Sequence, residues 1–245
     1  MKKTGAIILV NAITMTRVIG TFLMPFVSLN FTAEKLVAYI IVLLLTDSID
    51  GIMARRLKVS TLFGALLDTL ADKLLAIATL IILARSYYVM WLPLLLEVII
   101  TLINVLSGTK GSTIESTMIG KAKTWILGIG TVFGFITVFA DDFINLFDNS
   151  TTIGMCLINI FKFISKKSKI IMIIIAIITS ISSLIVAINY FMKHHKEIID
   201  NKKSGFYNKK YKLKKGKDLI EALFSTEFYE KTKNDSVLTR LGKEV

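Results

Sequence analysis

Long apolar runs, separated by shorter or longer polar segments, dominate the pattern of this chain. Because about 20 apolar residues cross the hydrocarbon of a bilayer, runs of this length are typical of transmembrane helices rather than of a soluble core. Such runs cover residues 13–29, 36–53, 62–83, 90–106, 125–139 and 170–191. The pattern therefore predicts an all-α polytopic membrane protein with six transmembrane helices, built as one membrane domain over residues 1–192.

Positive charge is concentrated beyond the last of these runs. The 245 residues are 53% apolar and carry a formal net charge of +12, and much of the excess lysine falls in residues 193–245. A polybasic segment after a transmembrane helix is attracted to anionic headgroups, so we expect a basic cytoplasmic tail that is dispensable for chemistry. Within the tail, residues 218–224 have the pattern of a short amphipathic helix. No recognised nucleic-acid module accompanies the charge, which argues against a nucleic-acid partner.

The lysines and arginines also predict an orientation. The positive-inside rule puts residues 1–3, residues 55–58, Lys110, residues 121–123 and the tail on the cytoplasmic face of a cell membrane, as six spans require. One cluster disagrees, because it precedes the last run and would then lie outside. Residues 156–164 can instead form an interfacial helix, and the side of the membrane stays open for this cluster of Lys162, Lys166, Lys167 and Lys169.

Four aspartates interrupt two of the apolar runs. Asp47 and Asp50 lie in the second run, and Asp68 and Asp72 lie in the third. At 3.6 residues per turn each pair occupies one face of its helix, and the two faces can meet if the chain reverses between residues 55 and 64. An uncompensated acid in a membrane costs about 3 kcal/mol, so we expect cations here. Carboxylates without histidine or thiolate suit a pair of Mg²⁺ or Mn²⁺ ions, which can clamp a transferring phosphoryl group.

The same faces carry small residues and one arginine. Gly51, Ala54 and Gly64 leave little side-chain bulk, so a flat ligand can approach the backbone. Arg55 supplies a fixed cation for phosphate oxygens. The single cysteine, Cys156, excludes an intramolecular disulfide and offers no thiolate zinc site.

With these residues the chain resembles the CDP-alcohol phosphotransferase family. The family signature, D-x2-D-G-x2-A-R-x8-G-x3-D-x3-D, is matched at every fixed position from Asp47 to Asp72. The resemblance implies a homodimeric enzyme that transfers a phosphatidyl group from CDP-diacylglycerol to an alcohol and releases CMP. It implies that Asp47, Asp50 and Asp68 hold the metal ions, with Asp72 as a further ligand, as the general base, or both. It also implies a cytidine and phosphate pocket shaped by Gly51, Ala54, Arg55 and Gly64.

Two further segments are similar to the phosphatidylglycerophosphate synthases of this family. Asn11, Thr14 and Arg17 match an N-x-x-T-x-x-R start and can present polar groups to the donor phosphates, although Arg17 can instead reach the headgroups. Lys121 and Lys123 match a G-K-x-K-T segment and put two ammonium groups at the cytoplasmic mouth. A phosphorylated acceptor, sn-glycerol 3-phosphate in the favoured interpretation, finds its counter-charge there. Lysines in this place also satisfy the positive-inside rule.

The fourth run departs from that subfamily. Leu96 and Asn104 stand where many phosphatidylglycerophosphate synthases carry arginines. Glu97 remains, and it can pair with Lys121 or Lys123 or contact the acceptor. An inositol-type alcohol or phosphatidylglycerol is therefore an alternative acceptor.

Two other classes of protein use the same features. A divalent-cation transporter would employ the acids as a relay, and it predicts metal flux without CMP release. A catalytically silent scaffold would bind lipid through the basic tail, and it predicts that Asp68→Asn and Asp72→Asn leave function intact.

Overall fold

The computed structural model describes residues 3–108, 118–148, 151–204, 211–213, 215–232 and 242–244. The side chains of Asp47, Arg55 and Asn104 lie outside what it describes, as do Lys110 and most of the tail lysines. The predictions made on these residues therefore stay predictions.

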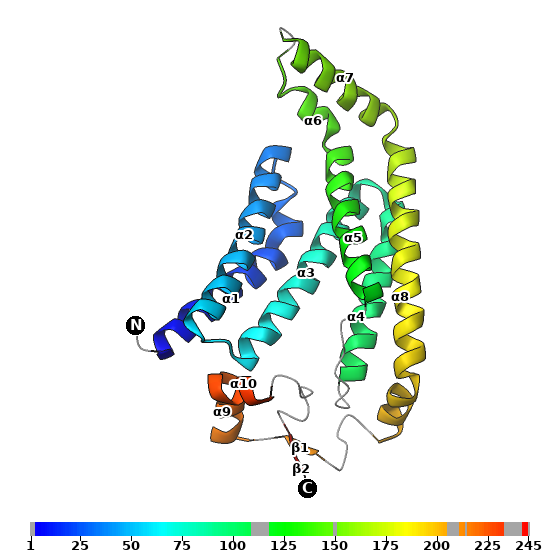
Figure 1. Ribbon diagram of the computed structural model, residues 1–245. Helices are drawn as coiled ribbons and strands as arrows, with labels where there is room; N and C mark the ends of the chain where they lie inside the picture. The colour runs from blue at the N-terminus through cyan, green and yellow to red at the C-terminus, as the bar shows by residue number, and fades with distance from the viewer. Residues whose placement is uncertain are drawn as a thin grey trace.

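Helices make up most of the described chain (Figure 1). The long ones are α1 (Lys3–Val27), α2 (Ala33–Leu57), α3 (Leu62–Ser86), α4 (Trp91–Gly108), α5 (Met118–Val138) and α8 (Ser168–Ser204). The short ones between them are η1 (Tyr88–Met90), α6 (Ala140–Ile144) and α7 (Thr152–Lys166). The predicted all-α fold is confirmed, whereas the six spans and the domain boundary stay predictions.

The tail beyond α8 contains regular structure of its own. It forms α9 (Lys217–Phe224), which confirms the predicted amphipathic helix, and α10 (Thr226–Thr232). It also forms an antiparallel strand pair, β1 (Tyr211–Leu213) with β2 (Gly242–Glu244), in which Tyr211 lies opposite Glu244. The sequence pattern did not predict this pair of strands.

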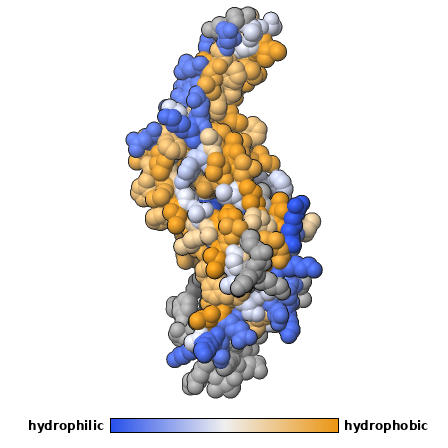
Figure 2. All heavy atoms as spheres, turned by 90° about the vertical axis from the view of Figure 1, so that its left-hand side faces the viewer, coloured by the Kyte–Doolittle hydropathy of each residue, from blue (hydrophilic) through white to orange (hydrophobic). Residues whose placement is uncertain are grey.

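The described helices are those of a membrane protein. Segments Thr4–Val27, Met118–Val138 and Ser168–Met192 are long and apolar enough to cross a bilayer, and Tyr88–Ile103 is a shorter apolar stretch. Large apolar side chains such as Phe22, Ile129 and Ile181 are exposed on their outer faces. Figure 2 shows an apolar band across the middle of one face, with hydrophilic residues gathered toward both ends. Such an exposed apolar band suits lipid rather than water.

Successive long helices run in opposite directions (Figure 1). The start of α1, the α2–α3 turn, the end of α4 and the tail helices lie toward the lower end of that view. Helices α6 and α7 lie at the upper end. The lysines of 162–169, all exposed, are therefore at the opposite end from exposed Arg56 and Lys58, and the disagreement between these clusters persists in three dimensions.

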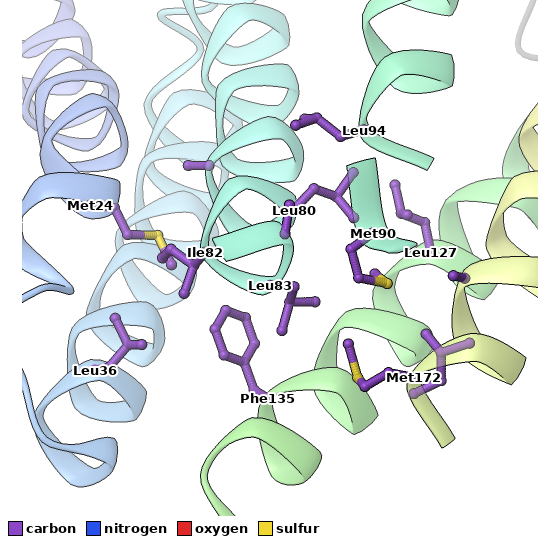
Figure 3. Close-up of a cluster of buried hydrophobic side chains, with 14 of the residues drawn as sticks. Met24, Leu36, Leu80, Ile82, Leu83, Met90, Leu94, Leu127, Phe135 and Met172 are labelled. Atoms are coloured by element: carbon purple, nitrogen blue, oxygen red, sulfur yellow. The ribbon is translucent and has the colours of Figure 1, made fainter. Parts of the chain in front are cut away.

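A core of buried apolar side chains packs the upper ends of these helices (Figure 3). Met24 comes from late α1, Leu36 from early α2 and Leu83 from late α3. Phe135 of α5 and Met172 of α8 complete the contact. The start of α1 and the α2–α3 turn lie at the other end, where Ala6, Val10 and Val59 form a smaller apolar cluster.

Two glycines allow α5 to approach its neighbours closely. A Cβ atom at Gly134 would lie 2.8 Å from Cδ1 of Leu83 in α3, and one at Gly130 would lie 2.8 Å from Cγ2 of Thr179 in α8. Leu83 and Thr179 are buried, so neither side chain has room to retreat. Gly128, two residues before Gly130, faces no such atom within 4 Å. The α5 backbone therefore packs tightly through Gly130 and Gly134 but not through Gly128.

This packing predicts different outcomes for two alanine substitutions in one helix. Gly130→Ala should destabilise the protein by about 1–3 kcal/mol, because the added methyl group overlaps Thr179. Gly128→Ala is the matched control and should be neutral or slightly stabilising, because alanine is the better helix former. Thermal unfolding of the purified protein in detergent measures both. Equal melting temperatures for the two variants would contradict the close contact.

Candidate functional site

A cavity of about 310 Å³ opens at the lower end, where α1 begins and α2 turns into α3. All three helices line it, together with the α2–α3 turn and one residue of α10. The cavity brings together most of the residues that the sequence predicted for the donor and metal sites, namely Asn11, Thr14, Asp50, Gly51, Ala54, Gly64 and Asp68.

The predicted chain reversal between residues 55 and 64 is confirmed. Helix α2 ends at Leu57, and Lys58 takes a left-handed conformation with φ of 52°, which lets Val59 N donate to Ala54 O at 3.0 Å. This type of turn ends helices and is uncommon for a residue other than glycine. It turns the chain at once into α3, so that Asp50 and Asp68 line the same cavity.

Asp50 is held against α1 by a hydrogen bond. The hydroxyl of Thr14 donates to Asp50 Oδ2 at 2.7 Å, and both residues are buried. A hydrogen bond to a carboxylate is stronger than one between neutral groups, and it offsets part of the cost of removing the charge from water. Thr14 therefore fixes the position of Asp50 on the cavity wall.

Arg17 is the cation that the acids require. Its Nη2 atom lies 2.7 Å from Asp68 Oδ1 and 3.6 Å from Asp72 Oδ1. The arginine side chain is only 2% exposed, whereas those of Asp68 and Asp72 are 53% and 64% exposed. Arg17 thus points inward to the second acidic pair, and the alternative in which it reaches the headgroups is wrong. The carboxylates themselves stay open to a ligand.

Gly64 lies beside Asn11 at the first turn of α3. A Cβ atom there would lie 2.9 Å from Asn11 Oδ1, so any larger residue would displace the asparagine. The Gly64 N–H donates to Oγ1 of Thr61 at 3.1 Å, which caps the start of α3. Gly64 therefore allows α1 and α3 to pack closely, and it also leaves the backbone open to a ligand.

Carboxylate oxygens on one cavity fit a hard divalent cation by the chemistry of their donor atoms. Asp50 and Asp68 line the cavity, whereas Asp72 does not. Among the described side chains no group of three histidine, cysteine, aspartate or glutamate residues is gathered as a metal site, and the side chain of Asp47 is not among those described. In this arrangement Thr14 and Arg17 compensate the acids.

A second buried charge cluster links α3, α4 and α5. Glu97 is 1% exposed and pairs with the ammonium group of Lys123, which is 4% exposed, while Lys73 Nζ lies 3.4 Å from Glu97 Oε1. The expectation that Lys121 and Lys123 both face the mouth needs correction, because only Lys121 is exposed. Pairing with Glu97 is what draws Lys123 inward.

The Glu97–Lys123 pair predicts an asymmetric response to mutation. Lys123→Met should destabilise the protein by about 3–5 kcal/mol, because it leaves Glu97 buried with only the more distant Lys73. The double variant Lys123→Met/Glu97→Leu should recover most of that loss, since neither charge remains. Thermal unfolding in detergent tests both variants. A double variant less stable than Lys123→Met would show that Lys123 does not offset the cost of burying the Glu97 carboxylate.

Some residues at the cavity were not singled out from the sequence. Ser60 and Thr61 of the turn line it, and so does Tyr229 of α10, more than 150 residues away in the chain. The turn residues follow directly from the chain reversal. No signal in the sequence connects Tyr229 with α1 to α3.

The fold and the cavity define a helical membrane protein with a site between its first three helices that contains Asp50 and Asp68. The family model described as CDP-alcohol phosphatidyltransferase matches residues 7–156. The chain therefore belongs to the CDP-alcohol phosphatidyltransferase family.

Three curated relatives all carry the name CDP-diacylglycerol–glycerol-3-phosphate 3-phosphatidyltransferase. The one from Bacillus subtilis (strain 168) is 39% identical over 84 residues, which are 33% of this chain and 44% of the relative. The one from Yersinia enterocolitica is 37% identical over 87 residues, or 32% of this chain and 48% of the relative. The one from Pectobacterium atrosepticum is 34% identical over 128 residues, or 46% and 70%. The chain thus spans about half the length of the first two. No solved structure matches it.

Proposed function

We propose that this protein transfers the phosphatidyl group of CDP-diacylglycerol to an alcohol and releases CMP, as a step of phospholipid biosynthesis. The observation that carries the proposal is the cavity between α1, α2 and α3. Residues of the family signature, Asp50, Gly51, Ala54, Gly64 and Asp68, line it beside Asn11 and Thr14. Family membership and a membrane-protein fold support a lipid-linked substrate.

The donor binds with its diphosphate in the cavity and its acyl chains in the bilayer. Asn11 and Arg55 donate hydrogen bonds to the phosphate oxygens, while Thr14 keeps Asp50 in place. Gly51, Ala54 and Gly64 leave space for the cytidine and the phosphates. The exposed apolar faces of α1 and α2 keep the acyl chains at the side of the cavity.

The four aspartates are the residues that hold the divalent ions on which this family generally depends. Their oxygen atoms suit Mg²⁺ or Mn²⁺, in a pair bound by Asp47, Asp50, Asp68 and Asp72. When bound, such ions neutralise the diphosphate and make CMP a better leaving group. Thr14 and Arg17 hold two of these carboxylates on the cavity wall.

Asp72 serves as the general base. The acceptor oxygen forms a bond to the phosphorus that carries diacylglycerol, and the bond from that phosphorus to the oxygen of CMP breaks. The proton of the acceptor hydroxyl moves to the Asp72 carboxylate, which is 64% exposed and lies one turn along α3 from Asp68 of the cavity. Arg17, 3.6 Å from Asp72 Oδ1, orients the carboxylate.

The acceptor is sn-glycerol 3-phosphate in this proposal. Three relatives carry that acceptor in their names, and exposed Lys121 at the start of α5 offers an ammonium group for its phosphate. Lys123 is buried in its pair with Glu97 and is therefore not assigned to the acceptor.

The membrane arrangement has six spans, α1 to α5 and α8, in the cell membrane. Helices α1, α2 and α3 have 25 residues each and rise about 37 Å, enough for a hydrocarbon layer of about 30 Å. Helix α3 crosses despite Asp68, Asp72 and Lys73 because these charges are paired, the two aspartates with Arg17 and the lysine with Glu97. The site faces the cytoplasm, where CMP and a water-soluble acceptor are handled, and a homodimer stays a prediction from the family resemblance.

Release of CMP tests the reaction directly. Purified protein receives CDP-diacylglycerol, Mg²⁺ or Mn²⁺, and one acceptor from a panel of glycerol 3-phosphate, inositol phosphate, serine and phosphatidylglycerol. We expect the fastest release with glycerol 3-phosphate, and a loss of about 100-fold or more in Asp68→Asn, because the site loses a metal ligand. Asp141→Asn is the matched control, since Asp141 is exposed on α6 at the other end of the molecule.

Each result of that assay has a separate meaning. Faster release with another acceptor would change the substrate but keep the chemistry. Full activity of Asp68→Asn would contradict the assignment of Asp68 to the metal site. Metal flux into vesicles without CMP release from any acceptor would replace the proposal with a cation transporter.

Lys121→Ala tests recognition of the acceptor. Loss of one charge-assisted hydrogen bond should raise the KM for glycerol 3-phosphate about tenfold, with the KM for CDP-diacylglycerol unchanged. Lys169→Ala, an exposed lysine at the opposite end, should change neither constant. An unchanged acceptor KM in Lys121→Ala would exclude this lysine from the acceptor site.

A further inference from the structure

Among the described residues of the tail, one lines the cavity between α1, α2 and α3. Tyr229 of α10 lines it together with residues of α1, α2, α3 and the turn between α2 and α3. The tyrosine is half-buried, although it belongs to a basic tail whose charge alone predicts only attraction to lipid. Attraction of the basic tail to the membrane surface does not explain why Tyr229 lines this cavity.

Specific contacts hold the tail helices at this place. The ring of Phe224 in α9 packs on Phe63 in the first turn of α3, with ring centroids 4.9 Å apart. Ala222 of α9 is fully buried. Figure 1 shows α9 and α10 beneath the lower ends of α1 to α3. The tail therefore packs onto α3 at the first turn, next to the cavity.

A short joint carries α10 from α9 to the cavity. Ser225 ends α9 with its N–H donated to Glu221 O at 2.9 Å, and its hydroxyl accepts from Phe228 N at 3.2 Å to cap α10. Tyr229 N donates to Ser225 O at 3.1 Å, so Tyr229 belongs to the first full turn after this cap. Because Ser225 both ends α9 and caps α10, the two helices hold a defined orientation. The packing of Phe224 on Phe63 therefore also sets the position of Tyr229.

The two ends of the cavity differ in chemistry. Asp68 lies seven residues beyond Thr61 along α3, a rise of about 10 Å. The end near Asp68 and Asp50 is acidic and suits the diphosphate with its metal ions. The end near the α2–α3 turn holds neutral groups, among them Ser60, Thr61 and the phenol of Tyr229. A nucleotide that puts its phosphates at the acidic end has its base at the neutral end.

We propose that Tyr229 binds the nucleobase of the CDP-linked donor, so that α9 and α10 form one wall of the donor site. The inference rests on the proposed function, because it takes the nucleotide as the ligand of the cavity. The phenol ring stacks on the pyrimidine, an interaction that suits any flat base, and the hydroxyl group reaches its polar edge. The tail is then part of substrate binding rather than a dispensable lipid contact.

Tyr229→Ala is the direct test, made in the full-length protein in detergent or nanodiscs. Loss of one base–aromatic contact should weaken binding of cytidine 5′-diphosphate about tenfold and raise the KM for CDP-diacylglycerol by a similar factor. The KM for the alcohol acceptor should not change, because the acceptor does not meet the base. Tyr229→Phe should keep most of the affinity if stacking is the larger contribution.

Two control variants separate base contact from folding of the tail. Lys231→Ala changes an exposed residue of the same helix that does not line the cavity, and it should bind the nucleotide as the wild type does. Phe224→Ala removes the packing on Phe63 and should weaken nucleotide binding while the melting temperature of the membrane domain stays unchanged.

The outcomes distinguish this inference from the proposed function. Wild-type affinity for cytidine 5′-diphosphate in Tyr229→Ala, with normal CMP release, would overturn the inference and leave the function standing. Tighter binding in Tyr229→Ala would also overturn it, since the tail would then obstruct the cavity. A wild-type protein that neither binds the nucleotide nor releases CMP would overturn both.

Discussion

Compensation of carboxylates on apolar membrane helices is the constraint on which the rest of this structure depends. Asp50, Asp68 and Asp72 lie on helices whose surroundings are apolar, where an isolated charge is costly. Thr14 and Arg17, one turn apart on α1, satisfy them by a hydrogen bond and an ion pair of 2.7 Å each. Helix α1 must therefore pack against both α2 and α3 at this level. The same contacts that make the acids tolerable also enclose the cavity.

The apolar core and the polar site lie at different ends of the helices. Leu83, Phe135 and Met172 pack the helices at one end, and Gly130 and Gly134 let α5 come close enough to take part. At the other end the helices enclose a cavity of about 310 Å³ beside a smaller apolar cluster of Ala6, Val10 and Val59. A second compensated acid, Glu97 with Lys123 and Lys73, joins α3 to α4 and α5. Charge pairing and core packing thus fix different levels of one helix bundle.

The tail changes how the site is bounded. Phe224 and Tyr229 belong to a segment whose composition resembles a lipid-binding extension, yet one packs on α3 and the other lines the cavity. A site formed only by α1, α2 and α3 would be open where the α2–α3 turn ends. With α10 beside it, the cavity has an aromatic wall on that side, which suits a ligand with a flat base next to its phosphates. The tail and the first three helices therefore bound one cavity.

The sequence by itself determined the helical membrane class, and its spacing put Asp50 and Asp68 on faces that meet if the chain reverses between residues 55 and 64. The structure shows that reversal directly after Leu57. Arg17 was ambiguous, because a long cationic side chain on a membrane helix reaches equally well for headgroups or for a neighbouring acid. The inward turn of Lys123 and the strand pair of the tail depended on partners far away in the chain. Only the tertiary structure decided that Tyr229 lines the cavity, since packing of one ring on Phe63 leaves no periodic signal in the sequence.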